Sequence, residues 1–270
     1  MKNGSLPNYI ECEDQSWRII REEMIKIPPS EEERIMAIIS LVPESCSSIL
    51  DAGCGNGEIA NRLILQHKKV YGLDVSKESL QDVKSNKILG TLESLPFPDR
   101  CFDLVICSEV LEHVHFNVYK ESLKEIERVA AKYIIISVPN NENIKENFIT
   151  CPDCGCNFHP SRHLRSFNLA SVKDLFCQFI TKSTSLCRPL VRSYPRILLK
   201  GARFLGFIKK HFHYYSICPQ CGYFVSPEHR VITNNQVNGN LKTLCFRLLK
   251  SCRKHKGWII VLYERLTDGL

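Results

Sequence analysis

The sequence of 270 residues carries a net charge of +7; 24% of its residues are charged and 44% are hydrophobic. These proportions are typical of a globular chain with a core and argue against a disordered or collagen-like one. No apolar run approaches the roughly 18 residues that a membrane-spanning helix needs, and the N-terminal residues lack the apolar segment of a secretory signal. We therefore expect a cytoplasmic protein whose 14 cysteines are thiols or metal ligands rather than disulfides.

Helices and strands are expected to alternate along most of the chain. Residues 1–48 form a helical segment, in which Ser30 and Glu33 have the spacing of a capping box. Period-2 and apolar runs predict strands at 47–53, 68–76, 102–110, 132–140, 179–186 and 257–266. The helical spacing of apolar residues predicts helices over 58–67, 76–86, 109–115, 117–131 and 168–176. Such alternation predicts a doubly wound, Rossmann-like α/β fold with a mostly parallel sheet.

A glycine-rich turn follows the first predicted strand, in the stretch LDAGCGNGEIA of residues 50–60. Glycines at 53, 55 and 57 let a ligand approach the backbone closely. A dinucleotide fingerprint would need glycine at the position of Glu58, and the lysine of a P-loop is also missing. Asp74 ends the next strand, where a carboxylate can bind ribose hydroxyls.

These residues resemble the class I S-adenosylmethionine (SAM)-dependent methyltransferases. The resemblance runs from Ile49 to Asn140 and includes ILDAGCGNG, VYGLDVS, GTLESLPFPDRCFDLVICSEVLEHV and LKEIERVAAKYIIISVPN. It implies a SAM site in which the glycine turn contacts the methionine end, Asp74 the ribose, and Leu92 with Glu93 the adenine. Thr91 departs from the family, where an Asp often stands, so adenine contact would be weaker or shifted to Glu93. The full implied set is Asp51, Gly53, Cys54, Gly55, Gly57, Asp74, Val75, Leu92, Glu93 and Ser108.

Candidate catalytic residues follow the strand at 102–110. In the resemblance, the helix there faces the methyl group, and His113 is the first candidate base, oriented by Glu109 or Glu112. The alternative is that Glu112 and His113 only cap or pack the helix. His163, in HPSRHLRSF, has the H-x-x-x-F spacing seen beside the acceptor pocket of many relatives and is a second candidate base. It could equally hold its own loop through a hydrogen bond.

Two cysteine pairs share the form C-P-x-C-G: Cys151 with Cys154, and Cys218 with Cys221. Each resembles a zinc knuckle, and four thiolates suit one tetrahedral structural Zn²⁺. Cys156 or His159 could replace one ligand. Two separate redox pairs are the weaker alternative, because neither pair precedes a helix in a thioredoxin-like unit.

The second half of the chain is basic. No Asp or Glu occurs from 175 to 227 or from 230 to 256. Basic amphipathic helices are expected over 195–212 and 241–256. They could cover the protein's own core, bind an anionic membrane peripherally, or bind RNA, for which no stacking-rich motif stands out.

The sequence therefore predicts a methyltransferase with a small zinc-binding insertion. Its parts would be the helical segment 1–48, the SAM-binding core 49–150, an acceptor-side region 151–256 with zinc loops at 151–165 and 216–224, and an antiparallel last strand in 257–270. The expected acceptor is a small molecule, glycan or lipid-linked compound, methylated on oxygen. The alternatives are an RNA methyltransferase and a non-catalytic SAM-binding protein that serves partner binding.

Overall fold

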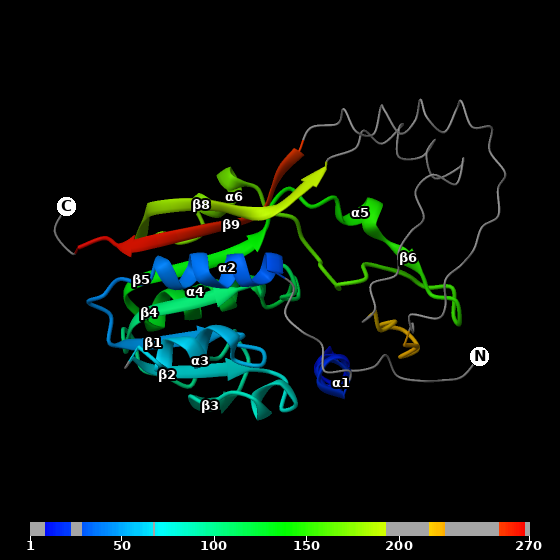
Figure 1. The fold of residues 1–270 in the computed structure, drawn as a ribbon, viewed down its shortest axis with the longest axis horizontal. Coiled ribbons are helices and arrows are strands. Elements are labelled where there is room, and N and C mark those ends of the chain that lie inside the picture. Colours follow the sequence, from blue (N-terminus) through cyan, green and yellow to red (C-terminus); the bar gives the residue numbers. More distant parts are fainter. Residues whose placement is uncertain (1–8, 23–28, 67, 193–215, 225–253, 268–270) are drawn as a thin grey trace.

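The computed structural model describes residues 9–22, 29–66, 68–192, 216–224 and 254–267. At their centre is a seven-stranded sheet of order β3-β2-β1-β4-β5-β9-β8 (Figure 1). Its first five strands in the chain pair in parallel, and β9 pairs antiparallel with both β5 and β8. The strands are β1 (Ser48–Ala52), β2 (Lys69–Asp74), β3 (Asn86–Leu89), β4 (Phe102–Ser108), β5 (Ala130–Pro139), β8 (Phe179–Arg192) and β9 (Lys254–Arg265). The doubly wound sheet with an antiparallel last strand is confirmed.

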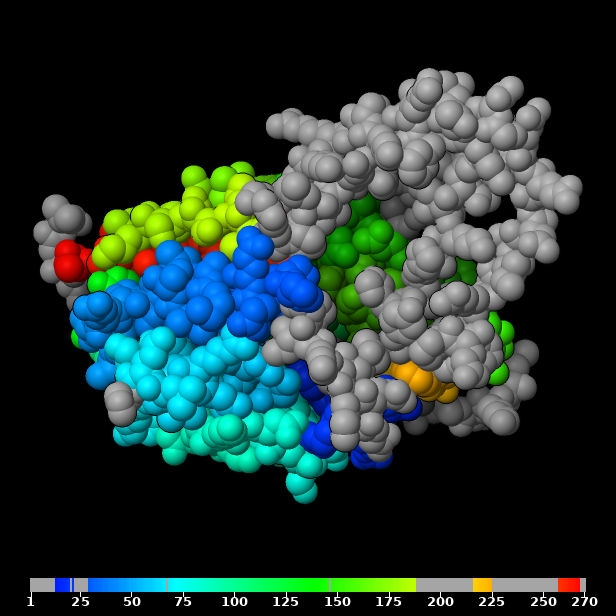
Figure 2. All heavy atoms as spheres, in the orientation of Figure 1, coloured from blue at the N-terminus to red at the C-terminus, as the bar shows by residue number. Residues whose placement is uncertain are grey.

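Helices cover both faces of the sheet because its central strands are apolar on both sides. On one face, α2 (Pro29–Ser40) and α3 (Glu58–Ile64) pack against β1, β4, β5 and β9, and Figures 1 and 2 show α2 lying across this face. On the other face, α4 (Tyr119–Val129) and α6 (Leu169–Lys173) pack against the same strands. Full burial of a side chain such as Ile134 stabilises the fold by roughly 1.5–3 kcal/mol.

The N-terminal helix α1 (Tyr9–Glu22) lies apart from this layered core, beside the ends of the strands (Figure 1). Polar contacts hold it to the segment after β2. The Ser76 hydroxyl donates to Asp14 Oδ1 at 2.6 Å, and the Arg21 guanidinium lies 3.0 Å from Glu78 Oε2. Because such contacts are exposed or half-buried, α1 is attached less firmly than the helices that pack on the sheet.

Three expectations about local structure are wrong. The helix expected over 76–86 is a single 3₁₀ turn, Ser79–Gln81, followed by β3. The Ser76 hydroxyl accepts a hydrogen bond from the Ser79 backbone at 3.1 Å, as a helix N-cap does, but the turn ends at Gln81 and the chain enters β3 at Asn86. The helix α2 begins at Pro29, so Ser30 lies inside it rather than capping it. The segment 109–115 forms turns instead of a helix.

The region after β5 contains a short helix, α5 (Ile144–Asn147), and a two-stranded hairpin of β6 (Ile149–Thr150) and β7 (Asn157–Phe158). The expected basic helix over 195–212 lies outside the described residues. The one expected over 241–256 does as well, except for its last three residues, which belong to β9.

Candidate active site

The glycine turn connects β1 to α3 in a conformation that only glycine adopts easily. Gly53, Gly55 and Gly57 all have positive φ angles, of 80°, 53° and 81°. A Cβ atom at Gly53 would lie 2.4 Å from a Val110 methyl carbon, and one at Gly55 would lie 2.7 Å from the Trp17 ring. Both positions therefore need glycine for backbone conformation and for space.

Asp74 ends β2 directly beside this turn. Its Oδ2 accepts a hydrogen bond from the Gly55 backbone at 2.9 Å, and its Oδ1 accepts one from the Ser76 backbone at 2.9 Å. Burial raises the pKa of Asp74, although these backbone donors oppose the shift. These donors hold the carboxylate at the tip of β2, where Asp74 lines the same cavity as the glycine turn.

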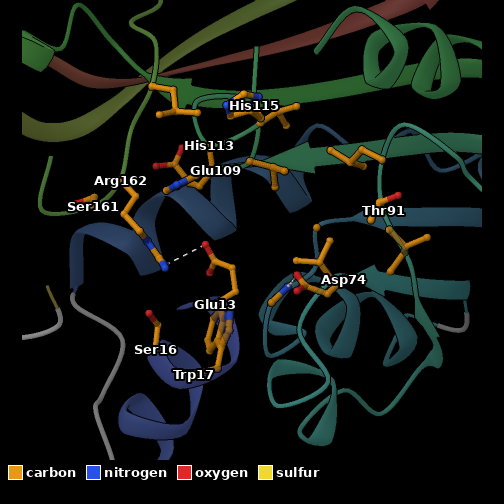
Figure 3. Close-up of a pocket in the computed structure, with 18 of the residues that line it drawn as sticks. Glu13, Ser16, Trp17, Asp74, Thr91, Glu109, His113, His115, Ser161 and Arg162 are labelled. Atoms are coloured by element: carbon orange, nitrogen blue, oxygen red, sulfur yellow. Dashed lines mark hydrogen bonds and ion pairs between the residues drawn. The ribbon is translucent and has the colours of Figure 1, made fainter. Parts of the chain in front are cut away.

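A cavity of about 710 Å³ opens in front of the turn and Asp74 (Figure 3). Six of the ten predicted cofactor residues line it, and two predicted catalytic residues, Glu109 and His113, line the same cavity. Thr91, the position that departs from the family, is also in its wall. The six are Gly53, Gly55, Asp74, Val75, Leu92 and Glu93.

The other four predicted cofactor residues are not part of the cavity wall; they support it. Asp51 is buried, and its Oδ2 accepts a hydrogen bond from the Ala60 backbone at 3.2 Å in the first turn of α3. Burial raises the pKa of Asp51 to about 7. Cys54 packs with Leu80 and Val83; Gly57 is the N-cap of α3; and the Ser108 hydroxyl accepts a hydrogen bond from Arg34.

Three cavity residues of α1 had no assigned role in the sequence: Glu13, Ser16 and Trp17. Figure 3 shows them opposite Asp74, and Glu13 forms an ion pair of 2.9 Å with Arg162. Burial raises the pKa of Glu13, and the Arg162 charge opposes this. Glu13 and Trp17 are four residues apart in α1 and so share one helix face, but the sequence does not show which surface that face meets.

Glu109 does not orient His113, contrary to one of the two expected arrangements. Its Oε2 accepts a hydrogen bond from the Trp258 indole at 2.7 Å, and its Oε1 accepts one from the Ser137 hydroxyl at 3.3 Å. The backbone of Glu109 has φ 57°, which turns the chain sharply after β4. Both partners come from the neighbouring strands β5 and β9, so Glu109 links the turn to the sheet.

Glu112 is buried, and His113 beside it is half-buried. The Glu112 side chain has no exposed surface, and neither of its carboxylate oxygens has a hydrogen-bond partner among the described residues. The same is true of His113 Nδ1. Burial, with the nearby Glu109 charge, raises the pKa of Glu112 well above its usual range, and burial lowers the pKa of His113 well below its own.

His163 lies against His113, with the ring centroids 4.7 Å apart and the rings nearly perpendicular. Its Nδ1 contacts Glu142 Oε2, and His159 Nε2 lies 3.1 Å from the other Glu142 oxygen. Burial opposes ionisation of Glu142, but its contacts with the two imidazoles outweigh that effect and hold its pKa well below the usual range. Glu142 was not predicted, because it meets the histidines only through the fold.

The four predicted cysteine ligands gather in one place. The Sγ atoms of Cys151 and Cys221 are 3.6 Å apart, those of Cys154 and Cys218 are 3.5 Å apart, and all four lie within 4.8 Å of one another. The two loops share one geometry, in which Gly155 donates to the Cys151 carbonyl at 3.0 Å and Gly222 to the Cys218 carbonyl at 2.9 Å. Cys156 and His159 are not part of this cluster.

The sheet order, the glycine turn and the carboxylate at the tip of β2 are the arrangement expected of a class I methyltransferase domain. Residues 50–134 match the family model described as a methyltransferase domain. Two solved SAM-dependent methyltransferases share the fold. The one from Archaeoglobus fulgidus has a TM-score of 0.54 at 15% identity, over 92% of this chain and 99% of that one. The one from Methanosarcina mazei has a TM-score of 0.50 at 15% identity, over 90% and 100%.

Curated relatives match over shorter stretches. An uncharacterized protein of Methanocaldococcus jannaschii is 31% identical over 153 residues, which cover 54% of this chain and 64% of that protein. A ubiquinone biosynthesis O-methyltransferase of Rickettsia bellii is 36% identical over 97 residues, 33% of this chain and 40% of the relative. The chain thus spans less than two thirds of these two relatives.

Proposed function

We propose that this protein transfers the methyl group of SAM to an oxygen atom of a small-molecule, glycan or lipid-linked acceptor. The observation that carries the proposal is the single cavity that joins the glycine turn and Asp74 to Glu109 and His113. The site fits SAM because Gly53, Gly55 and Asp74 line one cavity, and the Gly55 and Ser76 backbones hold the Asp74 carboxylate in place beside the turn. When bound, SAM supplies an activated methyl group on its sulfonium.

The chain's own residues would mainly hold donor and acceptor in line. Holding two reactants in a near-attack arrangement can supply roughly 7–11 kcal/mol of the barrier. An alcohol or phenol must also lose its proton, and a positioned base contributes about 10²–10⁴-fold. His113 is the proposed base, because it lines the cavity and burial keeps it neutral. His163 is the second candidate, and the buried Glu112 lies within 4.8 Å of both histidines.

We assign one structural Zn²⁺ to Cys151, Cys154, Cys218 and Cys221. A tetrahedral site with Zn–S bonds of ~2.3 Å places sulfurs about 3.8 Å apart. The two measured S–S distances of 3.5 and 3.6 Å approach that value. The ion would join the β6–β7 hairpin to the loop around Cys218 and leave no open position for chemistry.

The acceptor class and the surroundings of the protein belong to the same proposal. No helix among the described residues is long and apolar enough to cross a membrane. We propose a cytoplasmic protein that touches anionic membranes at most peripherally, through basic segments outside the described residues. The alternatives are an RNA acceptor and a SAM-binding protein without turnover.

Replacement of His113 separates an enzyme from a binding protein. His113→Ala should lower turnover about 10²–10⁴-fold while the affinity for S-adenosylhomocysteine changes little, because the base contributes to the chemical step. Turnover would be followed by mass spectrometry of acceptor mixtures. The matched control is Asn117→Ala, an exposed residue of the same segment that does not line the cavity. Unchanged turnover in the His113 variant would contradict the proposed base.

A further inference from the structure

Three side chains at the edge of the cavity, of which His113 lines it, are arranged like the ligands of a metal ion. Glu112, His113 and His163 each present one ligand atom, and these atoms lie within 4.8 Å of one another. Two imidazoles and one carboxylate are a donor set that first-row divalent metals accept. This group shares no residue with the four-cysteine cluster.

Glu112 is the clearest sign that something is bound there. A buried carboxylate nearly always accepts hydrogen bonds, and a buried atom without a partner calls for a water or an ion. Both oxygens of Glu112, and Nδ1 of His113, are buried without a partner among the described residues. By contrast, both oxygens of Glu109, three residues earlier, accept hydrogen bonds, one from Trp258 and one from Ser137.

His163 is oriented as metal-binding histidines usually are. A ligating imidazole commonly donates its other N–H to a carboxylate, which fixes the tautomer. The Nδ1 of His163 faces Glu142 Oε2, so its Nε2 keeps the free lone pair. The His113 ring stands nearly perpendicular to His163, with centroids 4.7 Å apart, and Glu112 completes the group.

A second nearby group, Glu142 with His159 and His163, is less suited to an ion. The Nδ1 of His159 accepts a hydrogen bond from the His163 backbone at 3.2 Å, so this nitrogen carries no proton. The ring proton of His159 therefore sits on Nε2, which lies 3.1 Å from Glu142 Oε1 without the geometry of a hydrogen bond. With Nδ1 accepting a bond and Nε2 carrying the proton, His159 has no free lone pair for an ion.

We propose that Glu112, His113 and His163 bind one divalent transition-metal ion, with Glu142 as the outer carboxylate that orients His163. Arg162 carries a positive charge near His113, but it is already paired with Glu13 at 2.9 Å. Three protein ligands leave positions open toward the cavity. An ion there would lower the pKa of an acceptor hydroxyl, in place of a histidine base. Only this catalytic use rests on the proposed function; binding of the ion does not.

The test is titration of the full chain, with zinc supplied to the cysteines first, by Mn²⁺ followed by electron paramagnetic resonance of free Mn²⁺. Mn²⁺ is chosen because thiolates bind it poorly. We expect one bound Mn²⁺ per chain, affinity at least tenfold weaker in Glu112→Gln and His163→Gln, and about 10–100-fold weaker in Glu142→Gln. Asn117→Ala, outside the cavity, should bind Mn²⁺ as the unaltered chain does.

Binding of well under one Mn²⁺ per chain at millimolar concentration would overturn the inference, as would equal binding by the unaltered chain and His163→Gln. If Glu112→Gln fails to fold, the variants at the partly buried His163 and Glu142 still test whether the ion binds at this site. The same samples are titrated with S-adenosylhomocysteine. If S-adenosylhomocysteine binds but Mn²⁺ does not, only the ion site is contradicted. If Mn²⁺ binds but S-adenosylhomocysteine does not, only the methyltransferase proposal is contradicted.

Discussion

Glu13 and Arg162 form an ion pair of 2.9 Å between the N-terminal helix and the segment that follows the β6–β7 hairpin. Both side chains are mostly buried, with exposed fractions of 16% and 17%, and both line the cavity (Figure 3). The pair therefore holds α1 and its Trp17 over the glycine turn. A ligand in the cavity is covered by a helix that is attached mainly through polar contacts.

Breaking this ion pair should loosen α1 without unfolding the core. Arg162→Met leaves Glu13 buried and unpaired, at a cost of about 1–3 kcal/mol to the attachment of α1. We expect faster hydrogen exchange in residues 9–22 and weaker binding of S-adenosylhomocysteine. Arg18→Ala is the control, since Arg18 is 60% exposed and 3.6 Å from Glu78. Equal exchange in both variants would show that the pair does not hold the helix.

Gly55 should tolerate no side chain, for reasons of space as well as backbone conformation. The positive φ at this position would destabilise Gly55→Ala by roughly 1–2 kcal/mol. The added Cβ would also lie 2.7 Å from the Trp17 ring. Gly155→Ala pays the same backbone cost at φ 75°, with nothing within 4 Å. Calorimetry should show loss of S-adenosylhomocysteine binding in Gly55→Ala and unchanged affinity in Gly155→Ala. Equal affinity in the two variants would argue against a ligand at the turn.

Zinc removal should destabilise the insertion and spare the core. Cys154→Ser is expected to lose the metal, whereas Cys156→Ser should keep about one zinc per chain, because Cys156 stands outside the four-sulfur cluster. Metal content is measured by atomic absorption, and the core is followed by S-adenosylhomocysteine binding. Similar zinc loss in both variants would contradict the assigned ligands.

Asp103 should make the fold sensitive to acid. Burial opposes its ionisation, but hydrogen bonds from Lys132, Ser47 and Ser48 outweigh this and hold the pKa of Asp103 well below its usual range. Because the folded pKa lies below the unfolded value of about 3.9, the stabilisation is complete above that pH and is lost as pH falls further.

The comparison variant is Asp103→Asn, which should cost about 1–3 kcal/mol of unfolding free energy near pH 7. In urea titrations from pH 3 to pH 7, the difference between the two proteins should shrink toward pH 3. Asp99→Asn serves as control, since Asp99 is 77% exposed. A difference that stays constant with pH would mean that the charge of Asp103 does not stabilise the fold.

Local patterns predicted the parts of the site that sit on single elements. The turn at 53–57 and Asp74 follow directly from strand ends, since the carboxyl ends of neighbouring parallel strands meet at one edge of the sheet. The cysteine pairs repeat one short motif, so their meeting in space could also be expected. The alternation of strand-like and helix-like patterns was enough to predict the order of most strands and helices along the chain.

Contacts between distant segments could not be predicted in the same way. Trp17 reaches the glycine turn, and Glu142 reaches His163, only because of how the chain folds back. The pairing of Glu109 with Trp258 depends on the antiparallel β9 lying beside β5. In each of these contacts a polar or aromatic side chain meets a partner more than twenty residues away in the sequence. No periodic pattern links residues at such separations.

The most direct test of the central claim is calorimetric titration of the zinc-loaded chain with SAM and with S-adenosylhomocysteine. The structure predicts micromolar binding of at least one of them, lost in Asp74→Ala because the ribose hydroxyls then have no carboxylate to bind. The absence of binding by either compound, or equal binding by the Asp74→Ala variant, would contradict a SAM site at the glycine turn.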